Sequence, residues 1–153
     1  MTRKLRIVEP NAPTTEEAIL SFERRHGLKL PETYRRFLLR SNGGRPVPAT
    51  FPIRGFPDNP NDDIQVFFGL GSDVRTDDLY AVLSDLNSLI PAGVLPIAST
   101  GGDDFVCLDL REKSAPVVFW DRRPFWGTDE WSEHDLYPVA SDFEAFLQGL
   151  RDE

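Results

Sequence analysis

The chain has 153 residues, of which 40% are hydrophobic and 27% are charged, and its formal net charge at pH 7 is −8. This length is typical of one domain that buries its own core, and the composition excludes a disordered chain. The negative charge argues against direct binding of nucleic acid, and no stretch approaches the ~18 apolar residues of a membrane helix. We therefore expect a single domain over residues 1–153.

The charge is unevenly distributed along the sequence. Residues 1–50 contain ten Lys and Arg against five Asp and Glu, which gives +5. Residues 51–100 carry −5 and residues 101–153 carry −8. This asymmetry predicts a charged contact face.

The cysteine content and the first residues indicate a cytoplasmic protein. Cys107 is the single cysteine, which excludes an intramolecular disulfide and a structural cysteine–zinc site. A reducing compartment fits this usage. The first residues are basic but contain no apolar run before Glu9, so we expect no secretory signal.

Two helices are predicted in the first third of the chain. Thr14 and Glu17 have the spacing of a capping box, and Gly27 is a typical helix end. Pro31 suits the first position of a second helix, because its missing N–H is not needed there. The apolar face of that helix and its glycine-rich end are formed by Tyr34, Phe37, Leu38 and Ser41 and by Asn42-Gly43-Gly44.

Strand and loop signals alternate in the middle of the chain. Residues 50–53 predict a short strand that Pro52 confines to an edge, and residues 54–63 have the composition of a loop. Residues 64–68 predict a strand that is covered on both sides. Thr76 is the expected start of a third helix, with Leu79, Val82, Leu83 and Leu86 on its apolar face.

The last third predicts a meander followed by a helix. Strands are expected over residues 94–98, 105–110 and 117–121, with Gly102 and Asp103 in the first turn. Residues 122–135 form a polar loop, and Ser141 with Glu144 has the spacing of a second capping box. The predicted fold class is therefore α+β, a single domain with a mainly antiparallel sheet packed with about four helices.

Searches for catalytic and metal-binding patterns find none that is complete. A Cys–His nucleophile pair would need His26 or His134 beside Cys107, but Cys107 stands in a buried strand pattern. The acidic run from Asp58 lacks the glycine and glutamate spacing of a calcium loop. We expect no enzyme activity, no metal site and no cofactor.

The loop over residues 122–135 is the predicted partner-binding segment, because Trp and Arg dominate interface hot spots. Its indoles have a second interpretation, in which they fold back over the sheet. The acidic loops at residues 58–63, 73–78 and 129–135 would favour a basic partner, or would only keep the chain soluble. The predicted contact residues are Asp121, Arg122, Phe125, Trp126, Asp129, Glu130, Trp131 and Glu133.

A series of short motifs in fixed order resembles the SUKH superfamily, in particular its Smi/Knr-type branch. The resemblance runs from about Thr15 to Leu150. The motifs that carry it are Phe22-Glu23, Leu30-Pro31, Tyr34, Phe37-Leu38, Asn42-Gly43-Gly44, Leu95-Pro96-Ile97-Ala98, Gly101-Gly102-Asp103, Val106-Cys107-Leu108-Asp109, Val117 with Phe119-Trp120-Asp121, and Val139-Ala140-Ser141 with Phe143, Phe146 and Leu147.

The resemblance implies an α+β domain used for protein binding. Bacterial members are immunity proteins that neutralise polymorphic or contact-delivered toxins, many of them nucleases. We therefore expect a cytoplasmic immunity protein whose partner is a cognate, basic protein toxin. The alternative is a regulatory or scaffold protein of the fungal cell-wall-regulator type, without a toxin. The oligomeric state is not defined by the sequence.

The family motif residues have structural interpretations here: Leu30, Pro31, Tyr34, Phe37, Leu38, Asn42, Gly43, Gly44, Gly102 and Asp103.

Overall fold

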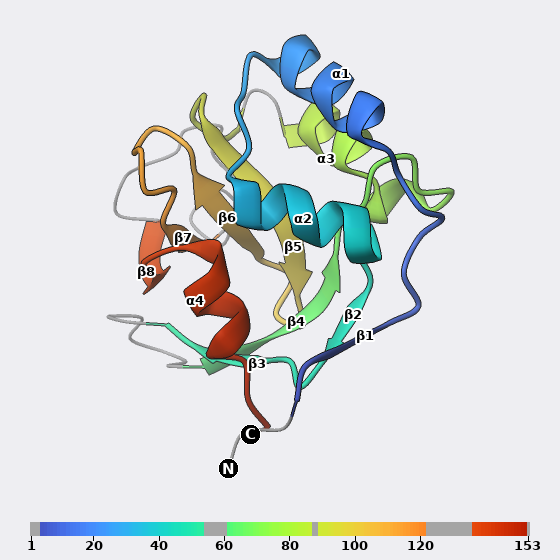
Figure 1. The fold of residues 1–153 in the computed structure, drawn as a ribbon. Helices are drawn as coiled ribbons and strands as arrows, with labels where there is room; N and C mark the ends of the chain where they lie inside the picture. Colours follow the sequence, from blue (N-terminus) through green and yellow to red (C-terminus); the bar gives the residue numbers. More distant parts are fainter. Residues whose placement is uncertain (1–3, 54–60, 87–88, 122–135, 153) are drawn as a thin grey trace.

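The computed structural model describes residues 4–53, 61–86, 89–121 and 136–152. Helices and strands are interspersed along the chain, and the two longest strands span residues 61–67 and 94–100 (Figure 1). In chain order the elements are β1 (Arg6–Val8), α1 (Glu16–His26), α2 (Glu32–Ser41), β2 (Arg45–Val47), β3 (Thr50–Pro52), β4 (Asn61–Phe67), the 3₁₀ helix η1 (Arg75–Asp77), α3 (Leu79–Leu86), β5 (Val94–Thr100), β6 (Phe105–Asp109), β7 (Val117–Trp120), β8 (Leu136–Ala140) and α4 (Phe143–Gln148).

The main sheet is an antiparallel meander of six strands. Its order is β3-β4-β5-β6-β7-β8, so each strand pairs with the next one in the chain, and β1 with β2 forms a separate ribbon. β3 lies at the edge of the sheet, as Pro52 predicts. This arrangement confirms the α+β class with a mainly antiparallel sheet.

Three strands and one strand start were not predicted. The three strands, β1, β2 and β8, are short. Pro46 weakens the strand pattern of β2, and Pro138 weakens that of β8. The expected loop over residues 54–63 is wrong at its end, because β4 begins at Asn61. Asp63 pairs with Thr50 across the sheet and accepts a hydrogen bond from the Thr50 hydroxyl at 2.7 Å. These contacts stabilise a strand start whose residue types favour a turn.

Helices α2 and α4 cover one face of the sheet (Figure 1). Phe67 of β4 lies on this face, with its ring centroid 5.0 Å from that of Phe37 in α2 and 6.2 Å from that of Phe143 in α4. Tyr34 contacts Phe143 edge-on at 5.2 Å. These rings form the centre of the hydrophobic core and hold the two helices against the sheet.

Helix α1 packs on α3, next to the sheet and α2 (Figure 1). Phe22 of α1 is fully buried and contacts Tyr80 of α3 edge-on at 5.2 Å. Gly27 ends α1 in the left-handed conformation, as predicted. None of the described helices is long and apolar enough to cross a membrane.

The helix starts are displaced by one or two residues from the predicted positions. Thr15, not Thr14, caps α1 by accepting from the N–H of Ala18 at 3.1 Å. Asp142, not Ser141, caps α4 in the same way at 2.8 Å, and Pro31 lies just before the first residue of α2. For the third helix, Asp78 takes the place expected of Thr76 and accepts from the N–H of Ala81 at 3.1 Å. Two adjacent residues are able to cap at the starts of α1 and α4, and both Thr76 and Asp78 are able to cap at the third start, so the pattern alone does not choose between them.

Candidate partner-binding surface

One of the predicted contact residues lies in the described part of the chain. Asp121 follows β7 directly and is buried, with 6% of its surface exposed. The other predicted contacts lie outside the described residues, and their role stays a prediction: Arg122, Phe125, Trp126, Asp129, Glu130, Trp131 and Glu133.

The family motif residues lie in the core and at its turns. Leu30, Tyr34, Phe37 and Leu38 are buried, three of them on the α2 face that packs on the sheet. Gly102 and Asp103 form the turn between β5 and β6, where the N–H of Asp103 donates to the carbonyl of Thr100 at 3.1 Å.

Asn42 joins three segments that are distant in sequence. Its side-chain amide donates to the carbonyls of Ala12 at 2.7 Å and Leu70 at 3.0 Å, and its Oδ1 accepts from the N–H of Leu70 at 2.9 Å. Gly43 beside it lies against β4, where an added Cβ would stand 2.6 Å from the carbonyl oxygen of Phe67. The sequence predicts only a helix end here, whereas the structure shows a tightly packed junction.

The groups able to act as nucleophile or base are not assembled into a site within the described residues. Cys107 is fully buried, and burial raises the pKa of its thiol well above the usual range. Burial and the nearby Arg25 lower the pKa of His26. No group of three or more His, Cys, Asp or Glu in the described part of the chain could hold a metal ion.

A groove opens between α3 and the face of the sheet opposite α2. Ser99 pairs with Phe105 across the sheet, and their neighbours Ala98 and Val106 also pair with each other. Successive side chains of a strand point to opposite faces, so Ser99 and Phe105 point away from the α2 face whereas Ala98 and Val106 point toward it. Side chains from α3 and η1 form the other wall. We call this site the α3 groove; it has a volume of about 570 Å³ and is lined by Arg45, Gln65, Val66, Val74, Thr76, Asp77, Val82, Asp85, Leu86, Leu89, Ser99, Asp103 and Phe105.

The α3 groove combines an apolar floor with an acidic rim. Val82 and Leu86 are buried in its floor, whereas Val74 is 54% exposed at its margin. The rim carries three carboxylates. Asp85 pairs with Arg75 at 2.7 Å, but Asp77 and Asp103 have no ion-pair partner among the described residues.

Sequence reasoning found one part of this groove and missed the rest. The acidic loop at residues 73–78 was predicted to face a partner, and Asp77 belongs to it. Asp103 was assigned only to a turn, because its proximity to α3 depends on the pairing of β5 with β6. Val74 offered a signal, since it is an apolar residue inside an otherwise polar run.

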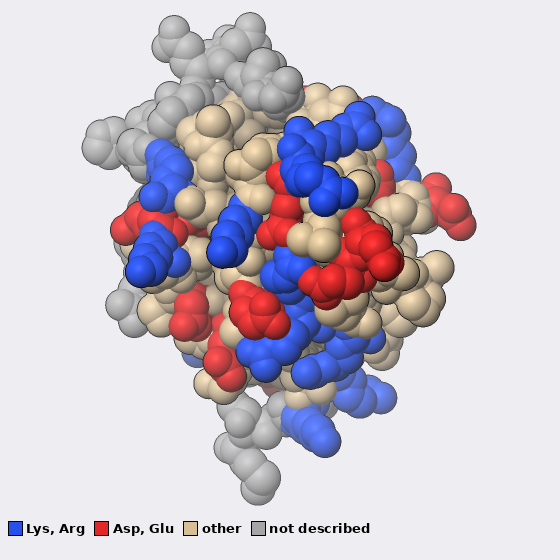
Figure 2. Space-filling view, turned by 45° about the horizontal axis from the view of Figure 1, so that its top comes forward, with Lys and Arg blue, Asp and Glu red and all other residues tan. Residues whose placement is uncertain are grey.

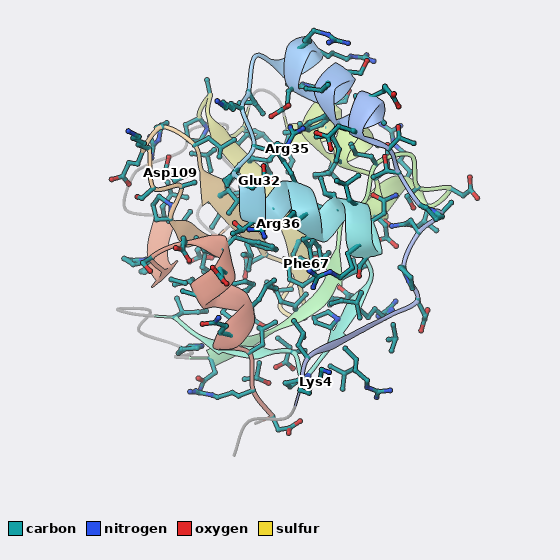
Figure 3. The ribbon with its side chains drawn as sticks, in the orientation of Figure 1. Lys4, Glu32, Arg35, Arg36, Phe67 and Asp109 are labelled. Atoms are coloured by element: carbon teal, nitrogen blue, oxygen red, sulfur yellow. The ribbon has the colours of Figure 1, made fainter. Side chains whose placement is uncertain are left out.

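The cations of the first third do not form a uniform basic face. Figure 2 shows Lys and Arg interleaved with Asp and Glu on the side of the molecule where α1 comes forward. Arg35 projects from α2 toward α1 and pairs with Glu23 at 2.5 Å and with Glu16 (Figure 3). Arg35 therefore ties two helices together, whereas Arg36 is 62% exposed and lies 3.9 Å from Glu32.

Fold and groove together define an α+β protein whose described residues form an acidic groove beside α3 and no group of three or more potential metal ligands. The sequence model of the SMI1/KNR4 family (SUKH-1) matches residues 13–149, and the chain belongs to this family. It is also similar to the SPbeta prophage-derived uncharacterized protein YokK of Bacillus subtilis (strain 168). The two are 25% identical over 154 residues, which cover 91% of this chain and 76% of that protein.

Proposed function

We propose that this protein is an immunity protein, which binds a cognate protein toxin and blocks its active site or substrate groove. The observation that carries the proposal is the family match over residues 13–149, since SUKH domains are often associated with toxin immunity. Its place of action is the cytoplasm, where a delivered toxin would meet its target.

The chemistry of the chain favours a basic toxin, such as a nuclease. The chain carries −8 overall, and −13 of charge lies beyond residue 50. Opposite charges on two partners speed their encounter and exclude partners of the wrong sign. Carboxylates that occupy the phosphate-binding groups of a nuclease would block it directly; the predicted ones are Asp121, Asp129, Glu130 and Glu133, with Trp126 and Trp131 as apolar anchors.

Co-expression tests the proposal. A candidate toxin gene chosen from the genes that flank this one is expressed alone and together with this protein in a sensitive host. We expect growth to be restored and the two proteins to elute together from a sizing column. Continued killing, with no complex on the column, would contradict the proposal and favour a regulatory or scaffold role without a toxin.

A further inference from the structure

We propose that the α3 groove receives a basic segment of the toxin, in which cationic side chains pair with Asp77 and Asp103 and an apolar side chain enters between them. This inference rests on the proposed function, and it adds contact residues from η1 and the β5–β6 turn to those predicted within residues 122–135. Three features of the described residues support it: rim carboxylates without an ion-pair partner, partly exposed apolar side chains and a backbone that is held by hydrogen bonds.

The charge of the rim favours a cationic occupant. Asp77 from η1 and Asp103 from the β5–β6 turn both line the groove, and neither has an ion-pair partner among the described residues. The third carboxylate, Asp85, is paired with Arg75, but both side chains are more than half exposed. Two carboxylates without an ion-pair partner in the described part of the chain are therefore open to incoming cations, and Arg45, which also lines the groove, already pairs with Glu9 at 3.8 Å.

The floor of the groove favours an apolar side chain beside those cations. Leu89 and Phe105 are partly buried and Val74 is 54% exposed, whereas Val66, Val82 and Leu86 form a closed apolar base with 8%, 7% and 5% of their surfaces exposed. The volume of about 570 Å³ accommodates several side chains rather than a whole helix. An extended segment with alternating basic and apolar residues fits this combination, because its side chains alternate in direction.

The acidic rim is held in place before a partner arrives. The backbone carbonyl of Asp77 accepts from the N–H of Gly69 at 2.9 Å, and the Asp78 carboxylate accepts from the N–H of Gly71 at 2.9 Å and of Ala81 at 3.1 Å. On the other side, Asp103 is fixed by its turn hydrogen bond to Thr100. Little backbone conformational entropy is then lost when a partner binds.

Two double variants of equal net charge distinguish binding in this groove from a general effect of the negative charge of the protein. Asp77→Asn with Asp103→Asn removes the unpaired rim charges, and asparagine tolerates the positive φ of 68° at position 103. The control is Glu17→Gln with Glu112→Gln, which removes two exposed carboxylates outside the groove. Urea unfolding of both variants checks that each remains folded.

The first probe is a synthetic peptide, Gly-Arg-Gly-Leu-Gly-Arg-Gly, titrated into the isotope-labelled protein in low salt. We expect amide chemical-shift changes at residues 74–77, 85–86 and 103–105, and an affinity about tenfold lower for the groove variant than for the control. Shift changes confined to other surfaces, or equal affinity for both variants, would overturn the groove assignment.

The second probe is a catalytically inactive form of the toxin encoded by the neighbouring gene. Weakening of at least tenfold by the groove variant alone supports the assignment. If the wild-type chain binds this toxin and the groove variant binds equally well, the groove assignment fails while the proposed function stands. If the wild-type chain does not bind it, the proposed function fails, and the peptide titration alone decides what the groove accepts.

Discussion

At the residue scale, two buried polar atoms have no hydrogen-bond partner within the described part of the chain. They are the hydroxyl of Tyr34 and Nε2 of His26. Tyr34 is fully buried among aromatic rings, and His26 contacts Phe22 and Tyr80 with ring centroids 4.7 and 5.7 Å apart. An unsatisfied buried polar group costs about 1–3 kcal/mol, so each of these two atoms lowers the free energy of unfolding by an amount of that order.

Tyr34→Phe removes the unpaired hydroxyl and keeps the ring. We expect the free energy of unfolding in urea to rise by about 1 kcal/mol at pH 7. Burial raises the pKa of Tyr34, so above about pH 10, where the unfolded chain loses this proton, the wild type should lose stability more steeply than the variant. A variant less stable than the wild type at pH 7 would show that the hydroxyl has a partner.

His26→Phe tests the titration of His26. Because burial and Arg25 lower its pKa, the unfolded state binds a proton first as the pH falls below about 6.5. The wild type should therefore lose stability between pH 7 and pH 5 relative to the variant, measured by urea unfolding at several pH values. His134 is present in both proteins, so it does not contribute to the difference between their stabilities. Parallel stability curves would contradict the lowered pKa.

At the element scale, the contact between α1 and α2 depends on Arg35. Glu23 accepts from Arg35 and, through its second oxygen, from the N–H of Leu30 at 2.7 Å. The Arg35 and Glu23 side chains are only 13% and 11% exposed, so this network is shielded from solvent and salt. Sequence patterns placed Arg35 off the apolar face of its helix but did not indicate its partners, which come from another helix.

Alanine variants of two adjacent arginines compare these environments. Arg35→Ala should lower the free energy of unfolding by about 2 kcal/mol, because Glu23 is left without its cation. Arg36→Ala should change it by less than about 0.5 kcal/mol, since its pair with Glu32 is exposed. Equal losses would contradict the bridging role. Arg36, rather than Arg35, is therefore the basic residue to reverse in binding controls.

Alanine substitutions at two glycines of positive φ test how tightly the junction at the end of α2 is packed. Gly43 (φ 80°) is packed against Phe67, whereas Gly27 (φ 63°) has open space where a Cβ would stand. Gly43→Ala should cost about 3 kcal/mol or more, and Gly27→Ala about 1 kcal/mol, in thermal or urea unfolding. A similar cost at both positions would show that backbone strain alone determines the preference for glycine.

These elements also show what local sequence determines. Apolar periodicity predicted the four α-helices and the central strands, because burial of one face fixes the register of each element. Short strands such as β8 depend on pairing with β7, which is a long-range property of the chain. The α3 groove brings Asp77 and Asp103 together across the fold, and no sequence spacing encodes that proximity.

At the scale of the whole molecule, the uneven charge predicts which side meets a basic partner. Reversal of Asp129, Glu130 and Glu133 to lysine should slow association with the toxin more than reversal of Arg36 to glutamate, measured by stopped-flow at low salt. Equal effects on the association rate would reduce the charge asymmetry to a contribution to solubility.

The central claim is that this SUKH-1 protein neutralises a toxin by binding it. Titration of the purified protein into the purified toxin of the neighbouring gene, with the toxin's activity as the readout, tests the claim most directly. We predict that inhibition is complete at one equivalent when the toxin concentration exceeds the dissociation constant. Full toxin activity in the presence of excess protein would contradict the claim.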